Sequence, residues 1–280
     1  MAQLTKPNIL HNWDFRNPVN QRYQTTYTNN VYTIDRWQSY HASGLVSIIT
    51  GGLRIGTENF AFRQYIEYPE KYAGLTLTLS ALVTDVYGSG DAALSVRTSD
   101  GLCGQITFNQ PGFYQATFTL PNSLTMLAFD ISSSVGGYVD VAAVKLELGT
   151  TSTLANDPPI DYGKELAVCQ RHQWVLDLST NPQLGIGVID ILYGANERTA
   201  MLSLCPPLPL RVKPALSLLD TPTITVYDPD YYERAATIIA VTGTAVLKVQ
   251  LAMDGTPPAA SGQAVIVIGS GGKLVFDANL

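Results

Sequence analysis

The sequence predicts an all-β protein in which two β-sandwich or jelly-roll domains are joined by one short helix. Apolar and polar residues alternate with a period of two in many segments, which is the pattern of half-buried strands. These segments recur about every 8–12 residues with turn residues between them, as in sandwiches and jelly rolls. Helical patterns do not alternate with the strands, so a parallel α/β sheet is not expected.

Length and composition agree with this class. The 280 residues suit one large β domain or two ordinary ones, and 46% of them are hydrophobic, which is enough for substantial cores. The net charge is −6, and neither half of the chain is basic, so nucleic acid is not an expected partner. No apolar run approaches the roughly 20 residues of a membrane span. The opening residues MAQLTKP lack the apolar core of a secretion signal.

The clearest strand of the first half covers residues 75–83. Its odd positions are apolar and are expected to face one core: Leu75, Leu77, Leu79, Ala81 and Val83. The intervening Thr76, Thr78 and Ser80 are expected to point away from that core, on a half-exposed surface. Residues 114–120 and 127–131 repeat the same alternation and predict two further strands.

The alternation changes phase between residues 139 and 148. Val139 and Val141 share one parity, whereas Val144 and Leu146 share the other. A slip of one residue would turn every side chain to the opposite face of a sheet. The sequence therefore predicts a bulge or kink near Ala142–Val144.

A connector and the one expected helix follow. Residues 149–159 end in Pro158-Pro159, which cannot extend a central strand. A helix is expected from Asp161 to Gln173, capped by Asp161 and carrying an apolar stripe of Tyr162, Leu166 and Cys169. This predicts three parts: a jelly-roll domain over 1–158, a linker helix over 159–173, and a β-sandwich domain over 174–280.

The second half returns to alternating strands, expected around 174–178, 189–193, 200–204, 224–226, 247–251 and 274–280. A proline-rich interruption at 206–209 leads to an extended edge segment ending at Pro214. Val265 to Ile268 are apolar on both faces, which predicts a central strand. The glycine-rich run 269–272 is expected to turn the chain, and the apolar Leu280 predicts that the last residues pack.

Recognisable catalytic motifs are missing. The sequence contains no phosphate-binding or dinucleotide-binding glycine motif, no zinc-protease motif and no nucleophile elbow. Cys103, Cys169 and Cys205 form no metal-ligand pattern and are expected to be buried thiols. The alternative is a nucleophilic Cys169 near His172. We therefore predict a protein that is not an enzyme, with no cofactor and no metal.

Two acidic groupings leave alternatives open. Asp228, Asp230 and Glu233 surround Tyr231 and Tyr232, as in a calcium loop, a glycosidase acid/base pair, or a solvated loop whose tyrosines contact a partner. The last interpretation is preferred because the spaced oxygen ligands of calcium loops are missing. A loop-bound cation among Asp85, Asp91 and Asp100 is a further alternative.

Aromatic residues gather near the N-terminus: Trp13, Phe15, Tyr23, Tyr27, Tyr32, Trp37 and Tyr40. An exposed aromatic platform would stack on sugar rings, whereas Trp13 and Trp37 are expected to fill the core. The candidate ligand-binding residues are Tyr23, Tyr27, Tyr40, Asp228, Asp230, Tyr231 and Tyr232.

The N-terminal segment carries a family resemblance. NILHNWDFRNPVNQR (8–22), followed by YTIDRW (32–37), resembles the opening of many bacteriophage and prophage tail-fibre or virion-surface proteins. One departure is Tyr23, at a position where that pattern commonly has glycine. Later segments resemble carbohydrate-binding-like jelly rolls in the same order: 64–67, 72–80 and VKLELG (144–149).

The resemblance continues into the second half. DYGKELAVCQR (161–171) is similar to the segment that joins such a module to a C-terminal β domain, and PLPLRVKP (207–214) resembles a motif of that second domain. The part beyond Pro214 is the least distinctive.

The resemblance implies a non-enzymatic structural protein on the virion surface, made in the bacterial cytoplasm, of the tail-fibre or receptor-binding type. It also implies a cyclic homo-oligomer, expected to be a trimer, that contacts other virion proteins or host surface glycan. The alternatives are a capsid head decoration or fibre protein, a glycan-degrading tail enzyme using Asp228, Asp230 and Glu233, and a bacterial glycan-binding module outside any virion.

Overall fold

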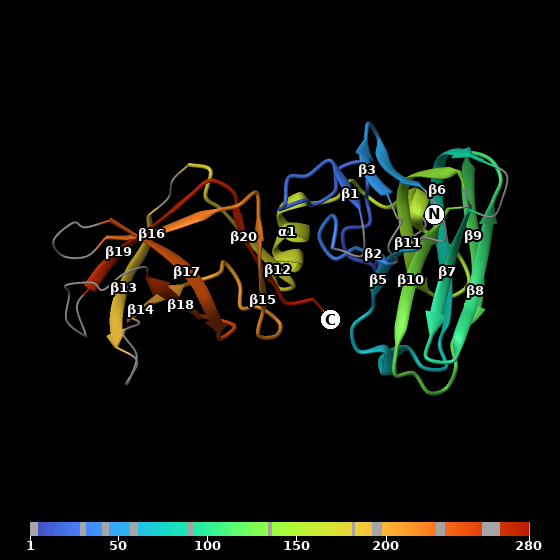
Figure 1. The fold of residues 1–280 in the computed structure, drawn as a ribbon. Coiled ribbons are helices and arrows are strands. Elements are labelled where there is room, and N and C mark those ends of the chain that lie inside the picture. The colour runs from blue at the N-terminus through green and yellow to red at the C-terminus, as the bar shows by residue number, and fades with distance from the viewer. Residues whose placement is uncertain are drawn as a thin grey trace. The chain divides into compact units, whose positions relative to one another are not determined.

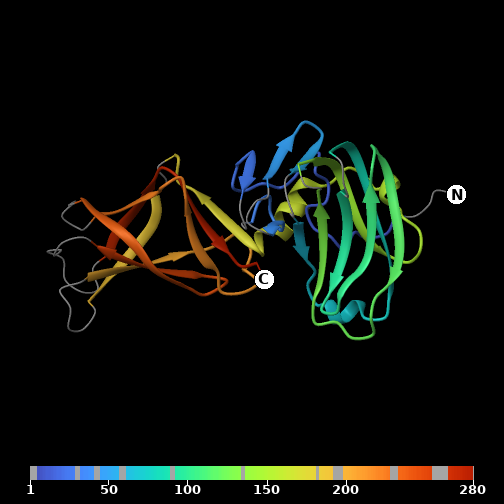
Figure 2. The ribbon, with the colours of Figure 1, turned by 45° about the vertical axis from the view of Figure 1, so that its right-hand side comes forward.

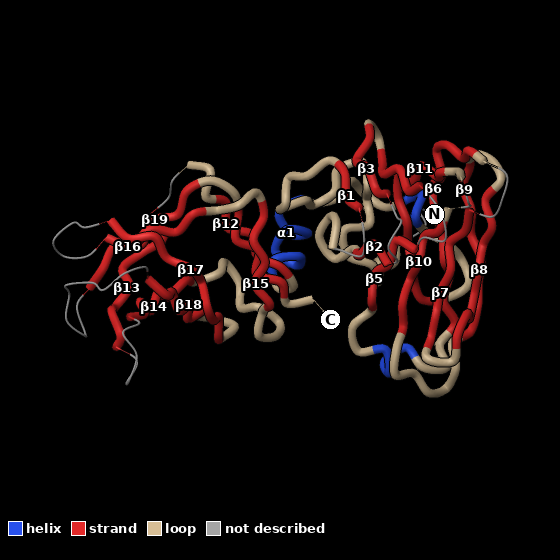
Figure 3. Tube along the Cα trace, viewed as in Figure 1, coloured by secondary structure: helices blue, strands red, loops and turns tan. Residues whose placement is uncertain are grey.

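The computed structural model describes residues 5–28, 32–40, 45–56, 61–88, 92–133, 136–180, 183–191, 198–227, 233–253 and 264–279. The chain divides into two compact units, Met1–Leu166 (unit 1) and Ala167–Leu280 (unit 2). Antiparallel strands build both units (Figure 1). Figure 3 draws the strands in red, and they make up most of both units. The predicted all-β class is confirmed. No helix among the residues listed above has the length and apolar character needed to cross a membrane.

Unit 1 is a sandwich of two sheets. Its strands are β1 (Thr26–Thr28), β2 (Gln38–Tyr40), β3 (Leu45–Ile49), β4 (Gly52–Gly56), β5 (Ala61–Tyr65), β6 (Thr76–Tyr87), β7 (Ala92–Thr98), β8 (Gly101–Phe108), β9 (Gly112–Thr119), β10 (Leu127–Ser132) and β11 (Tyr138–Leu148). The six-stranded sheet has the order β1-β3-β4-β11-β6-β9, and the five-stranded sheet has the order β2-β5-β10-β7-β8. Figure 2 shows these strands, coloured from blue to yellow-green, from a second direction. Their facing apolar side chains form one core that includes Leu79, Val144, Phe62 and Phe129.

Strand β6 is buried on both faces, which differs from the expectation. The odd positions from 77 to 83 face the core as predicted. Thr78 and Ser80, expected on a half-exposed surface, are also fully buried. The reason is that the chain after β11 returns over them: Thr78 Oγ1 donates to Gly149 O (2.7 Å), and Ser152 Oγ donates to Ser80 Oγ (2.8 Å).

The predicted bulge in β11 is confirmed. Val141 pairs with Val83 and Ala143 pairs with Leu82, so Ala142 has no partner in the β6 ladder. The extra residue compensates for the change of parity in the sequence, so apolar residues face the core on both sides of the bulge. As a result, Val141 before it and Val144 after it are both fully buried.

Gly52 in β4 lies against this bulge. A Cβ on Gly52 would stand 2.5 Å from Val141 O and 3.3 Å from Ala142 Cα, and neither backbone atom can yield without shifting the ladder. We expect Gly52→Ala to lower the free energy of unfolding of unit 1 by about 1–3 kcal/mol, measured by urea denaturation. Gly56→Ala in the same strand is the control, because its Cβ would meet nothing closer than 3.6 Å. Equal losses of unfolding free energy in the two variants would contradict the close packing of Gly52 against the bulge.

The single α-helix in the described parts of the chain, α1 (Tyr162–Gln170), is shorter than predicted. Asp161 caps it as expected, since its Oδ1 accepts a hydrogen bond from Lys164 N (3.2 Å), and this bond lowers the pKa of Asp161. Gln173 already belongs to the next strand, which shortens the helix. Two 3-10 turns, η1 (Pro69–Tyr72) and η2 (Leu154–Asn156), lie in unit 1.

Unit 2 contains a closed barrel, whereas the sequence predicts a sandwich. Its strands are β12 (Gln173–Asp177), β13 (Gln183–Ile191), β14 (Arg198–Leu204), β15 (Ala215–Leu219), β16 (Thr223–Tyr227), β17 (Glu233–Thr242), β18 (Leu247–Met253), β19 (Ala264–Ser270) and β20 (Lys273–Asp277). Six of them close a barrel in the order β13-β14-β18-β17-β16-β19, beside a three-stranded sheet β12-β20-β15. The predicted central strand is confirmed, because β19 pairs with both β13 and β16. Those two pairings complete the barrel.

Candidate functional site

The N-terminal motif residues form a buried hydrogen-bond network. Asn12 is fully buried and donates from Nδ2 to Val19 O and Asp35 O (2.8 Å each), while its Oδ1 accepts from Val19 N (2.7 Å). Trp37 Nε1 donates to Asn12 O (3.0 Å). The N-terminal motif therefore builds the scaffold of unit 1 and does not present these groups to a ligand.

The helix motif joins the same network. Glu165 Oε1 of α1 accepts a hydrogen bond from Asn12 N. Burial raises the pKa of Glu165, and the Asn12 hydrogen bond only partly opposes this.

This raised pKa gives a pH dependence. Because the folded state favours the protonated Glu165, stability is greatest below the ordinary pKa of glutamate and falls as pH rises through the raised value. Glu165→Gln keeps an acceptor for Asn12 N and removes the titration. We expect the urea midpoint of this variant to change less with pH than that of the wild type from about pH 4 upward. At neutral pH, the midpoint of the variant should be higher than that of the wild type. Parallel pH profiles of the two proteins would contradict this.

The predicted aromatic residues fall into different environments. Trp37 is fully buried, as expected, and Trp13 packs partly buried against the same core. Tyr27 is only 3% exposed and contacts Asn20 Oδ1 through its hydroxyl, which places it in the core and not on an exposed platform. Tyr23 is 73% exposed.

The acidic candidates have separate outcomes. Asp228, Asp230, Tyr231 and Tyr232 lie outside the described residues, and Glu233 is an exposed residue at the start of β17. Within the residues that the structure describes, no group of three or more His, Cys, Asp or Glu side chains could hold a metal ion. Cys169 is fully buried, so its thiol is not presented to solvent. The expectation of three buried thiols is wrong for the other two, because Cys103 is half-buried and Cys205 is exposed.

The best candidate site is on the outer face of the five-stranded sheet. Phe62 of β5 and Phe129 of β10 point into the core, so the alternating Arg63 and Asp130 point outward. The register places Arg63 directly opposite Asp130. We name the outward side chains of this sheet the arginine–tyrosine face: Tyr40, Arg63, Tyr65, Arg97 and Asp130.

Asp130 organises this face. Its Oδ1 lies 2.6 Å from Arg63 Nε and its Oδ2 lies 2.7 Å from Arg63 Nη2, while Arg97 Nε approaches Oδ2 at 3.0 Å. Arg63 Cζ lies 4.0 Å from the ring centroid of Tyr40, and Arg63 Nη1 donates to Tyr65 Oη (3.2 Å). Bidentate pairing and ring stacking hold these groups in fixed orientations.

The face carries more positive than negative charge. Burial lowers the pKa of Arg63, but hydrogen bonding and attraction to Asp130 together raise it by more than burial lowers it. The pKa of Arg63 is therefore raised overall, and Arg63 stays charged. Two arginines share one carboxylate. The Arg97 side chain is 46% exposed, whereas that of Asp130 is 2% exposed. Arg97 is therefore the charged donor of this face that is accessible to a ligand.

A second polar cluster lies on the outer face of the six-stranded sheet. Arg54 pairs with Asp140 (2.8 and 2.7 Å) and lies 3.8 Å from the ring centroid of Tyr138. Tyr138 stacks on Tyr87 (5.4 Å) and donates to Asp85 (2.9 Å), a hydrogen bond that raises the pKa of Tyr138. Only Asp85 of this cluster was singled out from the sequence. Its other members, and Arg63, Arg97 and Asp130, were not, because only strand pairing brings these residues together.

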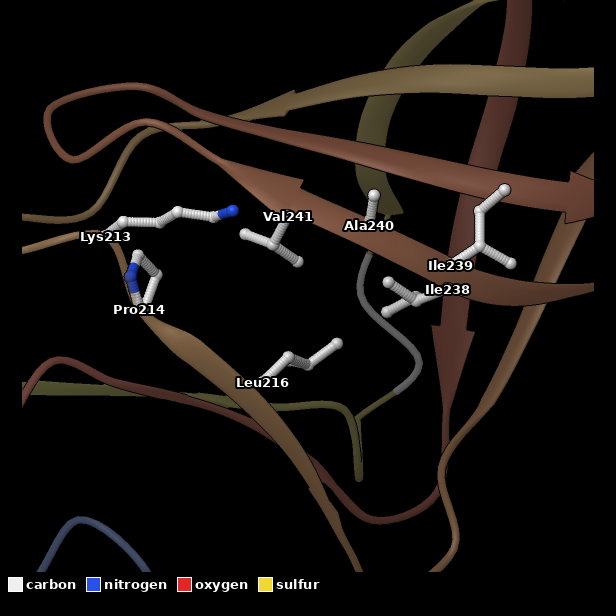
Figure 4. Close-up of a pocket in the computed structure, with 7 residues that line it drawn as sticks. All are labelled: Lys213, Pro214, Leu216, Ile238, Ile239, Ala240 and Val241. Carbon is white, nitrogen blue, oxygen red and sulfur yellow. The ribbon is translucent and has the colours of Figure 1, made fainter.

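Unit 2 contains an open pocket between β15 and β17. It has a volume of about 330 Å³, and Leu216, Ile238 and Val241 are among its lining residues. Lys213 is its charged member and extends toward Val241 (Figure 4). A neighbouring cavity of about the same volume shares Leu216 and Ile238.

No family model matches the chain, and no curated protein is similar to it. Among solved structures, the chain is similar to one described as CBM4 structure and function, with 15% identity and a TM-score of 0.32 over 49% of this chain and 98% of that chain. The CBM22-1–CBM22-2 tandem of Paenibacillus barcinonensis Xyn10C has 9% identity and a TM-score of 0.32, covering 99% and 98%. A Paenibacillus sp. cycloisomaltooligosaccharide glucanotransferase, complexed with cycloisomaltoheptaose, has 8% identity and a TM-score of 0.22, covering 91% and 46%. Similarity of this degree assigns no function.

Proposed function

We propose that the chain is a non-enzymatic structural protein of a phage virion, of the tail-fibre or receptor-binding type, which binds host-surface glycan through the arginine–tyrosine face. The ordered sequence motifs support the virion role. The observation that carries glycan binding is the set of oriented tyrosine and arginine groups held by Asp130, with Arg97 accessible beside them.

These groups suit a hydroxylated ligand that carries negative charge. Guanidinium groups form strong hydrogen bonds with carboxylates and phosphates, and tyrosine rings offer faces and hydroxyls at low entropic cost. The excess of one positive charge favours acidic over neutral sugars. We further propose a homotrimer, in which three weak sites bind one surface together.

Glycan binding is tested with the purified full chain against a panel of acidic and neutral bacterial polysaccharides, by surface plasmon resonance. We expect binding to an acidic polysaccharide. Arg97→Ala should weaken it roughly tenfold or more, because a charged hydrogen bond is lost. Asp130 remains paired with Arg63 in this variant, so the fold should persist. Tyr87→Ala, on the opposite sheet, is the matched control and should bind like the wild type. No binding to any polysaccharide, or equal binding by Arg97→Ala, would contradict the glycan role.

The virion role is tested separately by electron microscopy of phage particles with gold-labelled antibody against this chain. Label at the tail supports the proposal. Label on the head favours capsid decoration, and particles without label reject a virion role. Light scattering of the purified chain tests the trimer, and a monomeric mass would contradict it.

A further inference from the structure

A group of charged side chains is completely buried in unit 1, away from the arginine–tyrosine face. Lys145 and Glu147 lie two residues apart on β11, and both are 0% exposed. The returning chain covers them with Thr153, which is 1% exposed, and with Asp157, whose side chain is 7% exposed. Buried charges are costly, so this arrangement requires a specific explanation.

The lysine amine is in direct contact with the carboxylate of Asp157. Lys145 Nζ lies 2.5 Å from Asp157 Oδ1 and 2.6 Å from Oδ2. Both oxygens are almost equally close, so the amine is already in contact with the carboxyl group whose carbon, Cγ, a nucleophilic amine would attack.

Glu147 is linked to the same amine through one hydroxyl group. Lys145 Nζ donates to Thr153 Oγ1 (2.9 Å), and Thr153 Oγ1 donates to Glu147 Oε2 (2.7 Å). Thr153 N donates to Glu147 Oε1 (2.7 Å), which fixes the carboxylate in place. The chain Nζ–Oγ1–Oε2 provides a path for a proton from the amine to Glu147.

The environment favours the protonated form of the Asp157 carboxyl group. Burial raises the pKa of Asp157, and its contacts with Lys145 only partly oppose this. Proton transfer within the buried ion pair produces an amine and a carboxylic acid. Held in contact, such groups react as if each were present at very high concentration.

We propose that Lys145 and Asp157 condense to form an intramolecular amide bond. The lone pair of Nζ attacks Cγ and forms a tetrahedral intermediate. One carbon–oxygen bond then breaks, and the oxygen leaves as water with two protons that came from the ammonium group. Glu147 relays protons through Thr153. Ammonium plus carboxylate yields amide plus water, so charge and atoms balance and no co-reactant is needed.

The bond would close the segment 145–157 into a covalent loop. It would tie the connector that leads to α1 directly to the centre of the six-stranded sheet, because β11 pairs there with both β4 and β6. Force applied to the chain after Asp157 would then pass into β11 without unfolding the connector. This inference is independent of glycan binding.

Intact-mass spectrometry of the freshly purified full chain tests the proposal. We expect a mass lower than the sequence mass by one water molecule, and a proteolytic digest containing one branched peptide joined at Lys145 and Asp157. The full sequence mass would overturn the proposal. A water loss that fragmentation assigns to another aspartate, as a succinimide, would also overturn it.

Three variants sharpen the test. Asp157→Ala and Glu147→Gln should both show their full sequence masses, the first because the electrophile is gone and the second because the proton acceptor is gone. Lys6→Ala is the matched control, since Lys6 Nζ contacts Leu148 O beside the same segment, and it should keep the water loss. Complete linkage in Glu147→Gln would overturn the role of Glu147.

Discussion

Trp37→Ala is expected to lower the free energy of unfolding of unit 1 by about 3–5 kcal/mol. Trp37 is fully buried in the core of unit 1. Its ring stacks on Phe62 at 4.7 Å and meets Phe15 and Phe129 edge-on at 5.2 and 5.7 Å. Alanine would leave a large cavity in the centre of the core.

The same substitution removes a polar anchor. Trp37 Nε1 donates to His11 O (3.1 Å) and Asn12 O (3.0 Å), and both carbonyls would lose this donor in the interior. Urea denaturation followed by circular dichroism measures the loss. Phe113→Ala, at a side chain of the same unit that is 46% exposed, is the control and should cost less than about 0.5 kcal/mol. A Trp37→Ala variant as stable as this control would disprove the packing.

Asp130→Ala is expected to destabilise unit 1 by a similar amount, about 3–5 kcal/mol, because it breaks a buried ion pair from one side. The Arg63 side chain is only 8% exposed and would keep its charge without its bidentate partner. Removing a buried partner is costly mainly because of the charge that it leaves behind.

The exposed arginine of the same cluster provides the comparison. The Arg97 side chain is 46% exposed, so Arg97→Ala should cost only about 0–1 kcal/mol. Urea midpoints of the two variants, measured at neutral pH, separate them. Equal midpoints would show that Asp130 and Arg63 are more hydrated than the structure indicates.

The two substitutions also separate stability from recognition. Asp130→Ala lowers the stability of unit 1 and also disturbs the orientation of Arg63 against Tyr40 and Tyr65. Arg97→Ala removes an accessible donor and leaves the core unchanged. A loss of polysaccharide binding in the Arg97 variant, at unchanged stability, therefore reports on the ligand site itself.

The candidate site could not be predicted from the sequence. Arg63 and Asp130 are 67 residues apart and meet only because β5 and β10 pair in one particular register. Tyr27 illustrates the reverse case, since a tyrosine in a polar segment resembles a surface residue until its strand is placed over the core. Among the candidate ligand residues that the structure describes, which are Tyr23, Tyr27 and Tyr40, Tyr40 lies on the arginine–tyrosine face.

The all-β class, the central strand at 265–268 and the bulge at Ala142 are readable from residue order alone, because alternation of burial along a strand is a local property that each segment displays on its own. The closure of the barrel in unit 2, the burial of Thr78 and Ser80, and the contact of Lys145 with Asp157 appear only in the folded chain. Each of these depends on which distant segment covers or pairs with a strand, and that choice depends on the free energy of the whole packed unit.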